Sequence, residues 1–246
     1  MNTLQPPPDE MLARVLHRDG LMLVIDKPPG IPVHRGPKGG ANLEASFDAL
    51  CFGLPRPPVL AHRLDRDTSG CLVLGRHRKA TATLGLLFKH NKIEKTYWAV
   101  VEGGPAEEAG TIDIPIGRLN AERGWWQKPD PNGLPSETRW QVMGRGEGLT
   151  WLALQPITGR THQLRVHTSA MGWPIVGDNI YGNGPRFGEP VLHLHAREVV
   201  IPLSRNKPPV RVTAPPPPHM HQRLSACGWK GEPEASRPQG ASDDEA

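Results

Sequence analysis

Cysteines are few in this sequence, and long apolar runs are missing. The three cysteines, Cys51, Cys71 and Cys227, lie far apart and never in CxxC spacing, which excludes a disulfide framework and gives no support to a thiolate zinc site. The longest aliphatic run, residues 21–25, is far shorter than the ~18 residues of a membrane span. The first ten residues lack the basic-then-apolar pattern of a signal peptide. We therefore expect a soluble, cytoplasmic protein with reduced cysteines and no membrane partner.

Motifs that bind cofactors or carry nucleophiles are also missing. The sequence has no phosphate-binding P-loop, no GxGxxG run after an expected strand and no serine nucleophile elbow. His193 and His195 share one face of an expected strand, but no acidic or thiolate ligand stands at a helpful spacing nearby. We therefore expect no cofactor and no metal.

Glycine and proline, in contrast, are abundant, with 27 and 28 residues, and this composition indicates a loop-rich fold. Residues 1–10 are polar and proline-rich, and four prolines at 215–218 open a tail that ends in acidic residues. Neither segment offers much apolar area to bury. We expect a flexible N-terminus over residues 1–10, one folded domain over 11–213 and a disordered tail over 214–246, in a monomer.

Hydrophobic patterning within the folded part predicts mostly strands. Apolar runs and alternation predict strands near residues 21–25, 71–74, 96–102, 138–143, 149–154 and 191–201, and helices near 42–51 and 79–90. Alternation along residues 95–101 places Tyr97, Ala99 and Val101 on one face and Trp98 and Val100 on the other. Because several strands follow one another without helices between them, we expect an α+β fold built on a mixed, mainly antiparallel sheet.

Charge gathers in the run HRLDRDTSG, residues 62–70, directly before an apolar strand. The formal net charge is +4, but residues 231–246 contribute −4, so the remaining body carries +8. Residues 62–95 alone hold eight basic and three acidic side chains, which favours an anionic partner such as RNA. One interpretation is a solvated turn with local Arg–Asp pairs. The other is a catalytic carboxylate among cations, and composition does not choose between Asp65 and Asp67.

A second polar run, TGRTHQLRVH, occupies residues 158–167. Thr161 can cap a helix, which would place His162, Arg165 and Ser169 on one face. Arg160 would then stand near the helix N-terminus, where anions are favoured. The alternative is an amphipathic helix with a solvated basic side.

Together these runs resemble a known family. HRLDRDTSG, KTYWAVVEG (95–103), TGRTHQLRVH and GWPIVGDNIYG (172–182) resemble, in that order, the motifs of the RluA family of RNA pseudouridine synthases. The resemblance covers about residues 15–205. Many relatives carry a small RNA-binding domain ahead of the catalytic one, whereas only about ten polar residues precede it here. Substrate positioning is therefore expected from the catalytic domain itself.

The resemblance implies a pseudouridine synthase-like fold with a central active-site cleft, an isomerase activity of the intramolecular transferase type, and no cofactor. It makes Asp65 the catalytic aspartate, Tyr97 the aromatic residue packed on the target base, and Arg165 the basic partner that pairs with the aspartate. It suggests that Arg63 fills the space of the displaced uridine. The remaining residues expected to shape the loop or contact RNA are His62, Arg66, Thr68, Arg160, His162 and Gln163.

The resemblance implies that uridine is converted to pseudouridine in tRNA or large-subunit rRNA, a reaction that needs neither a redox agent nor an energy source. The base must leave its stack, which costs a few kcal/mol, and the carboxylate must stay ionised in a cleft shielded from water. Two other hypotheses use the same residues. One is a non-catalytic RNA-binding or remodelling protein, and the other is a metal-dependent phosphoryl-transfer enzyme with Asp65, Asp67 and histidines as ligands.

Overall fold

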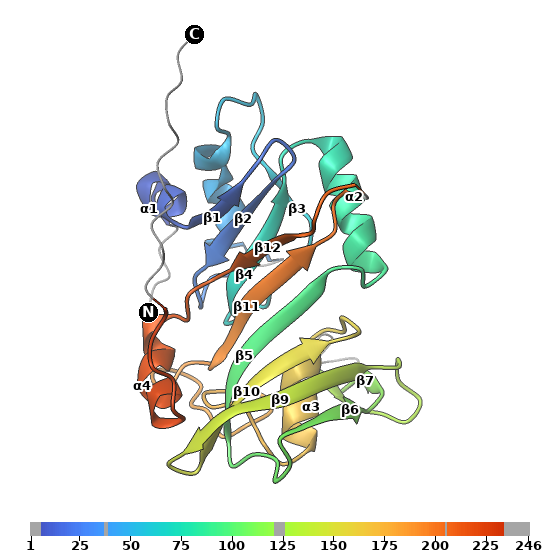
Figure 1. Cartoon of the computed structure of the whole chain (residues 1–246), viewed down its shortest axis with the longest axis vertical. Coiled ribbons are helices and arrows are strands. Elements are labelled where there is room, and N and C mark those ends of the chain that lie inside the picture. The colour runs from blue at the N-terminus through green and yellow to red at the C-terminus, as the bar shows by residue number, and fades with distance from the viewer. Residues whose placement is uncertain (1–5, 37–38, 121–125, 205, 234–246) are drawn as a thin grey trace.

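One mixed sheet extends along the molecule (Figure 1). This computed structural model describes residues 6–36, 39–120, 126–204 and 206–233, and within them ten strands form the sheet, in the order β1-β2-β4-β11-β5-β10-β9-β6, with β3 beside β4 and β12 beside β11. The strands are β1 (Val15–Arg18), β2 (Met22–Lys27), β3 (Val59–Leu60), β4 (Ser69–Gly75), β5 (Glu94–Glu102), β6 (Ala109–Asp113), β9 (Glu137–Gly146), β10 (Leu149–Pro156), β11 (Leu194–Ile201) and β12 (Val210–Thr213).

Helices cover this sheet, and a small ribbon lies beside it. The ribbon pairs β7 (Ile116–Arg118) with β8 (Gln127–Pro129). The helices are α1 (Pro8–Ala13), the 3-10 helix η1 (Leu43–Leu50), α2 (Arg78–Lys89), α3 (Gln163–Ala170) and α4 (Pro218–Ala226). No helix in the described part of the chain has the length and apolar character to cross a membrane.

Strand direction confirms the predicted fold class. The pairs along the sheet are antiparallel except β4 with β11, which run parallel with His195 opposite Ser69 and Ala196 opposite Gly70. Each strand and helix predicted from the pattern exists within a few residues of its expected bounds. The fold is therefore the mixed, mainly antiparallel α+β arrangement that the sequence indicated.

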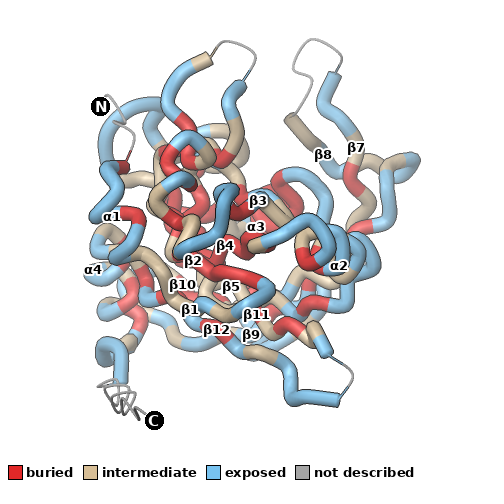
Figure 2. The backbone as a smooth tube through the Cα atoms, turned by 90° about the horizontal axis from the view of Figure 1, so that it is seen from above, coloured by how far each residue is buried: buried red, intermediate tan, exposed pale blue. Residues whose placement is uncertain are grey.

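The strands β2 and β4 are buried along almost their whole length (red in Figure 2). Every residue of β4 is buried, and alternate residues of β2 and β4 enter two separate cores. The core on one face includes Leu43, Phe47 and Leu50 of η1, and the core on the other includes Leu84 of α2. Each large aliphatic side chain that is fully buried contributes about 1.5–3 kcal/mol, which holds both helices on the sheet.

The second half repeats this arrangement around β5. Ala99 and Val101 pack into a core with Leu164 of α3, whereas Trp98 and Val100 pack against α4 on the opposite face. The predicted alternation along β5 is therefore confirmed. Tyr97 contacts both the η1-side core and the α3-side core, so its ring stands where the two halves of the molecule meet.

Part of each end that was predicted to be flexible is helical. Residues 214–233, assigned to a disordered tail, include the buried Ala214 and the helix α4. Met220 and Leu224 of this helix, together with Cys227 directly after it, enter the core beneath β5 and β10. At the other end α1 begins at Pro8, and the Ser46 hydroxyl donates to the carbonyl oxygen of Pro6. The apolar residues of α4 lie at helical spacing, but the four prolines ahead of them suggested a loop instead. Residues 1–5 and 234–246 lie outside the described residues.

Candidate active site

The two polar runs of the sequence meet across a cavity of about 380 Å³ beside the middle of the sheet. The loop before β4 supplies one wall and the segment leading into α3 supplies the other. Asp65, Tyr97 and Arg165 all line this cavity, and so do Arg63 and Arg160. A second hollow of about 1040 Å³ continues from it past Asp65. The structure therefore brings the three predicted catalytic residues to one site.

A buried lysine holds the Asp65 loop from below. Lys27, at the end of β2, is fully buried, and its Nζ donates to the carbonyl oxygens of Pro28, Arg66 and Thr68 at 2.8, 2.8 and 2.9 Å. Burial lowers the pKa of Lys27 to about 7 against the pull of the nearby Asp67 and Asp65 charges. Three carbonyls match the three N–H bonds of the ammonium form, so this side chain fixes the backbone on both sides of Asp67. The sequence analysis gave Lys27 no role.

Two further motif residues shape the same loop. Gly70 has φ +103°, and a Cβ at this position would lie 2.3 Å from the carbonyl oxygen of Ala196, so only glycine lets β4 approach β11 this closely. His62 accepts a hydrogen bond at Nε2 from the backbone N–H of Val73 and stacks on Phe88 with ring centroids 4.1 Å apart. Burial and the nearby Lys95 charge lower the pKa of His62 to about 3, so the ring is neutral. His62 therefore supports the cavity wall.

Asp65 faces the cavity with a side chain that is 33% exposed. A backbone hydrogen bond from Thr68 N–H to the Asp65 carbonyl oxygen, at 3.2 Å, closes the turn that presents it. Thr68 itself is buried. Across the cavity Tyr97 is partly buried, and burial together with the Asp65 charge raises the pKa of its phenol, which keeps the hydroxyl protonated. The arrangement places one carboxylate beside one neutral aromatic ring.

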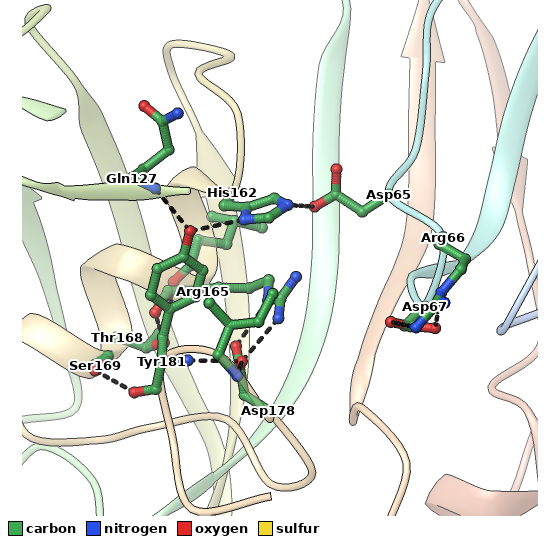
Figure 3. Close-up of polar contacts among 12 residues, drawn as sticks. Asp65, Arg66, Asp67, Gln127, His162, Arg165, Thr168, Ser169, Asp178 and Tyr181 are labelled. Carbon is green, nitrogen blue, oxygen red and sulfur yellow. Dashed lines mark hydrogen bonds and ion pairs between the residues drawn. The ribbon is translucent and has the colours of Figure 1, made fainter. Parts of the chain in front are cut away.

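Arg165 does not form the predicted ion pair with Asp65. Its Nε and Nη2 donate to the two carboxylate oxygens of Asp178 at 2.7 Å each, and both side chains are at most 5% exposed (Figure 3). Asp178 Oδ1 also accepts the backbone N–H groups of Ile180 and Tyr181. A buried guanidinium needs a fully matched partner, and Asp178 in the loop after α3 supplies both oxygens. The expected pairing was therefore wrong in its partner, although Arg165 still lines the cavity.

The segment entering α3 differs from the expectation in its cap. The helix begins at Gln163, and the residue before it is His162, which has a left-handed backbone with φ +54° and makes no side-chain cap bond. Gln163 instead ties the loop together, since its Oε1 accepts from Arg160 N–H and the Thr158 hydroxyl. Thr161 is exposed and does not cap the helix.

Helix α3 is also more buried than a helix with a solvated basic side would be. Residues 163–168 are all buried, which excludes that alternative. The Gln163 Nε2 donates to the Glu137 carbonyl oxygen and the Thr138 hydroxyl, so with its two accepted bonds the whole amide is used inside the protein. Gln163 was predicted to contact RNA, and the structure instead makes it a support for the cavity wall.

The predicted arginine contacts fall into two groups. Arg63 and Arg160 are exposed and line the cavity, where their guanidiniums can meet an anionic ligand. Arg66 is also exposed, but it points along the second hollow and pairs with Asp67 through bonds of 3.0 and 3.2 Å. The local Arg–Asp pairing weighed for this loop thus applies to Arg66 and Asp67. Within the described ranges, no three His, Cys, Asp or Glu side chains come together as a group that could hold a metal ion.

Comparisons with known proteins match this site to a family. A family profile described as RNA pseudouridylate synthase matches residues 21–170. An uncharacterised RNA pseudouridine synthase of Zymomonas mobilis is 40% identical over 208 residues, covering 83% of this chain and 94% of the relative. This chain belongs to the RNA pseudouridine synthase family. It is therefore an isomerase that acts on RNA.

Other relatives agree with this membership. Ribosomal large subunit pseudouridine synthase C of Vibrio cholerae is 35% identical, covering 89% of this chain and 73% of the relative. Among solved structures, human RNA pseudouridylate synthase domain containing 4 superposes with a TM-score of 0.74 at 28% identity, covering 89% of this chain and 95% of the human one. The cavity between the 62–70 loop and α3 is thus the candidate active site of a pseudouridine synthase.

Proposed function

We propose that this pseudouridine synthase isomerises one or more specific uridines of tRNA or of large-subunit rRNA, with Asp65 as the catalytic carboxylate and the target base flipped into the cavity. The observation that carries the proposal is the single carboxylate of Asp65, one-third exposed, in a cavity shared with Tyr97 and Arg165. Asp67, the neighbouring carboxylate, is paired with Arg66.

The isomerisation requires one ionised acidic side chain beside the target uridine. The N1–C1′ bond of the uridine breaks, the uracil turns, and a bond forms between C5 and C1′, while the hydrogen on C5 leaves as a proton and N1 gains one. Asp65 can act as a nucleophile or as a base in these reaction steps, and both roles need an ionised carboxylate at the same place. A cavity that excludes bulk water retains the detached uracil until it is rejoined.

Base flipping is supported by the side chains at the cavity entrance. Extrusion of a stacked base costs a few kcal/mol. Arg63 is exposed beside Asp65 and is long enough to occupy the place that the uridine leaves, and the ring of Tyr97 offers a surface on which the uracil can pack. These two contacts would offset part of the cost of extrusion.

The second hollow supports binding of the RNA around the target. Phe187 on its rim is 83% exposed, and the Arg186 guanidinium lies 5.5 Å from the centre of its ring. An exposed aromatic ring among arginines suits a stacked base flanked by phosphates. The exposed arginines that line this hollow are Arg35, Arg63, Arg66 and Arg186.

The test uses transcripts of tRNA and of large-subunit rRNA made with uracil tritiated at C5. Isomerisation releases the label to water, so the substrate pool loses up to one equivalent per modified site, and reverse-transcription mapping then locates the uridine. The name of the Vibrio cholerae relative supports the rRNA arm. We expect release from one pool at a defined position. Release from neither pool, or equal release from unstructured polyuridine, would contradict the proposed substrates.

A further inference from the structure

A chain of polar contacts leads from the protein backbone to Asp65 through two side chains that the sequence did not assign to catalysis (Figure 3). The backbone N–H of Gln127 donates to the Tyr181 hydroxyl at 3.0 Å. The Tyr181 hydroxyl lies 2.7 Å from His162 Nδ1, and His162 Nε2 lies 3.7 Å from Asp65 Oδ2. These contacts connect the β7–β8 ribbon to the catalytic carboxylate.

One arrangement of protons satisfies every contact in this series. The Tyr181 oxygen accepts from Gln127 N–H and has one O–H to donate, and we assign that donation to His162 Nδ1. A neutral imidazole that accepts at Nδ1 carries its proton on Nε2, the nitrogen that faces Asp65. Burial lowers the pKa of His162 against the raising effect of the Asp65 charge, which agrees with a neutral ring.

Both side chains are held firmly. His162 is 8% exposed, and its left-handed backbone is uncommon for a residue other than glycine, a feature that gathers at functional sites. Tyr181 packs edge-on to His162 with ring centroids 5.5 Å apart and lies under the Arg165 guanidinium at 5.2 Å. The Ser169 hydroxyl also bonds to the Tyr181 carbonyl oxygen. The imidazole therefore has one orientation, with Nε2 toward the cavity.

Asp65 has no closer candidate to orient it. Arg165 is committed to Asp178, and His162 is the one side chain within ion-pair distance of Asp65 among the residues that the structure describes. A separation of 3.7 Å is longer than a hydrogen bond, but catalytic hydrogen bonds are often long in the absence of substrate and shorten in the complex.

We propose that His162 is a positioning residue for the isomerase, whose Nε2–H, set by the Tyr181 hydroxyl, orients the Asp65 carboxylate toward the flipped uridine. This inference rests on the proposed function. The two residues act through Asp65, so their loss should slow the chemical step more than it weakens RNA binding.

The test compares kcat and KM for tritium release by His162→Phe, His162→Gln and Tyr181→Phe. His162→Phe removes a donor to a charged carboxylate, and we expect kcat to fall about 30-fold with little change in KM. Tyr181→Phe removes only a hydroxyl, and we expect about a 5-fold fall in kcat. His162→Gln keeps an N–H near the Nε2 position, so its kcat should recover to within about 5-fold of wild type. His221→Phe, at an exposed position in α4, is the matched control.

The outcomes distinguish a positioning role of His162 from a packing role, and both from a failure of the proposed function. Wild-type kcat in both His162→Phe and Tyr181→Phe overturns the positioning role, and so does an equal loss in His162→Gln and His162→Phe, which indicates packing alone. If His162→Phe does not fold, as shown by circular dichroism, the Tyr181→Phe result decides. Wild-type protein that releases no tritium from any RNA overturns the proposed function, and the positioning role with it, whereas activity in wild type but not in Asp65→Asn leaves only the positioning role in question.

Discussion

Replacing Asp178 by asparagine should destabilise the protein strongly, because it leaves the Arg165 guanidinium buried without a counter-charge. Both side chains are at most 5% exposed, and two bonds of 2.7 Å join them. Two charge-assisted hydrogen bonds contribute about 1.5–3 kcal/mol each, and breaking a buried ion pair from one side costs about 3–5 kcal/mol, so both routes give about 4 kcal/mol. Total stabilities of about 5–15 kcal/mol leave the variant folded but close to its limit.

Equilibrium unfolding in urea at pH 7 measures this loss, and the midpoint should fall by about 1.5 M. The matched control is Glu108→Gln, since Glu108 pairs with Arg145 at the surface with a side chain that is 75% exposed, and its loss should cost less than about 1 kcal/mol. A cost below about 1 kcal/mol for Asp178→Asn as well would refute the reasoning that the pair is a buried, matched ion pair.

The difference in unfolding free energy between wild type and Asp178→Asn depends on pH through the Asp178 carboxyl group. Burial acts to raise its pKa, but the hydrogen bonds and charge of Arg165 and the backbone N–H groups of Tyr181 and Ile180 outweigh it and hold the pKa of Asp178 below its ordinary value of 3.8. The stabilisation is therefore present above that value and is lost as the pH falls through the folded-state pKa. The difference in stability between wild type and Asp178→Asn should begin to narrow as the pH falls below about 4, and a constant difference would count against this assignment.

Three further variants test the supports around the cavity and its rim. Lys27→Met leaves three carbonyl oxygens around the Asp65 loop without their donor. Amide hydrogen exchange in residues 62–68 should therefore speed up, and kcat should fall about 10-fold or more. Unchanged exchange would contradict the role of Lys27 in holding this loop. Gly70→Ala should lower the free energy of unfolding in urea by about 3 kcal/mol or more, because the added Cβ meets the Ala196 carbonyl oxygen. Gly85→Ala, in open space on α2, should raise it by up to about 1 kcal/mol. Equal effects of the two substitutions would refute the argument that β4 approaches β11 too closely for a side chain at Gly70. Phe187→Ala should weaken RNA binding by about 1–3 kcal/mol in a filter assay at fixed salt with unchanged folding, and wild-type affinity would exclude stacking there.

Local pattern predicted most of the secondary structure because it depends on neighbours in sequence. The run near 71–74 is apolar throughout, as a strand between two cores requires, and the side chains of residues 95–101 alternate between the two faces of the sheet. The helix α4 was not predicted, although Met220, Leu224 and Cys227 have helical spacing. The prolines before these residues indicated a loop, and the short apolar stripe is stable as a helix only because it packs against the sheet.

The sequence indicated three residues that come together at the candidate site, but not which side chains pair there. The motif runs contained Asp65, Tyr97 and Arg165, and the fold brings them to one cavity. Which carboxylate meets Arg165 depends on distances between loops far apart in the chain, and the expected partner was the wrong aspartate. The role of Lys27 depends on three carbonyls that carry no side-chain signal, so no residue pattern could have indicated it.

The most direct test of the central claim compares Asp65→Asn with Asp67→Asn in tritium release from a substrate RNA under single-turnover conditions. The two carboxylates stand two positions apart in one loop, but Asp65 lines the cavity whereas Asp67 is paired with Arg66. Asp65→Asn should bind the RNA and release no label above background, while Asp67→Asn should keep the wild-type rate to within a few-fold. Label released by Asp65→Asn at the wild-type rate would contradict the assignment of the chemistry to this carboxylate.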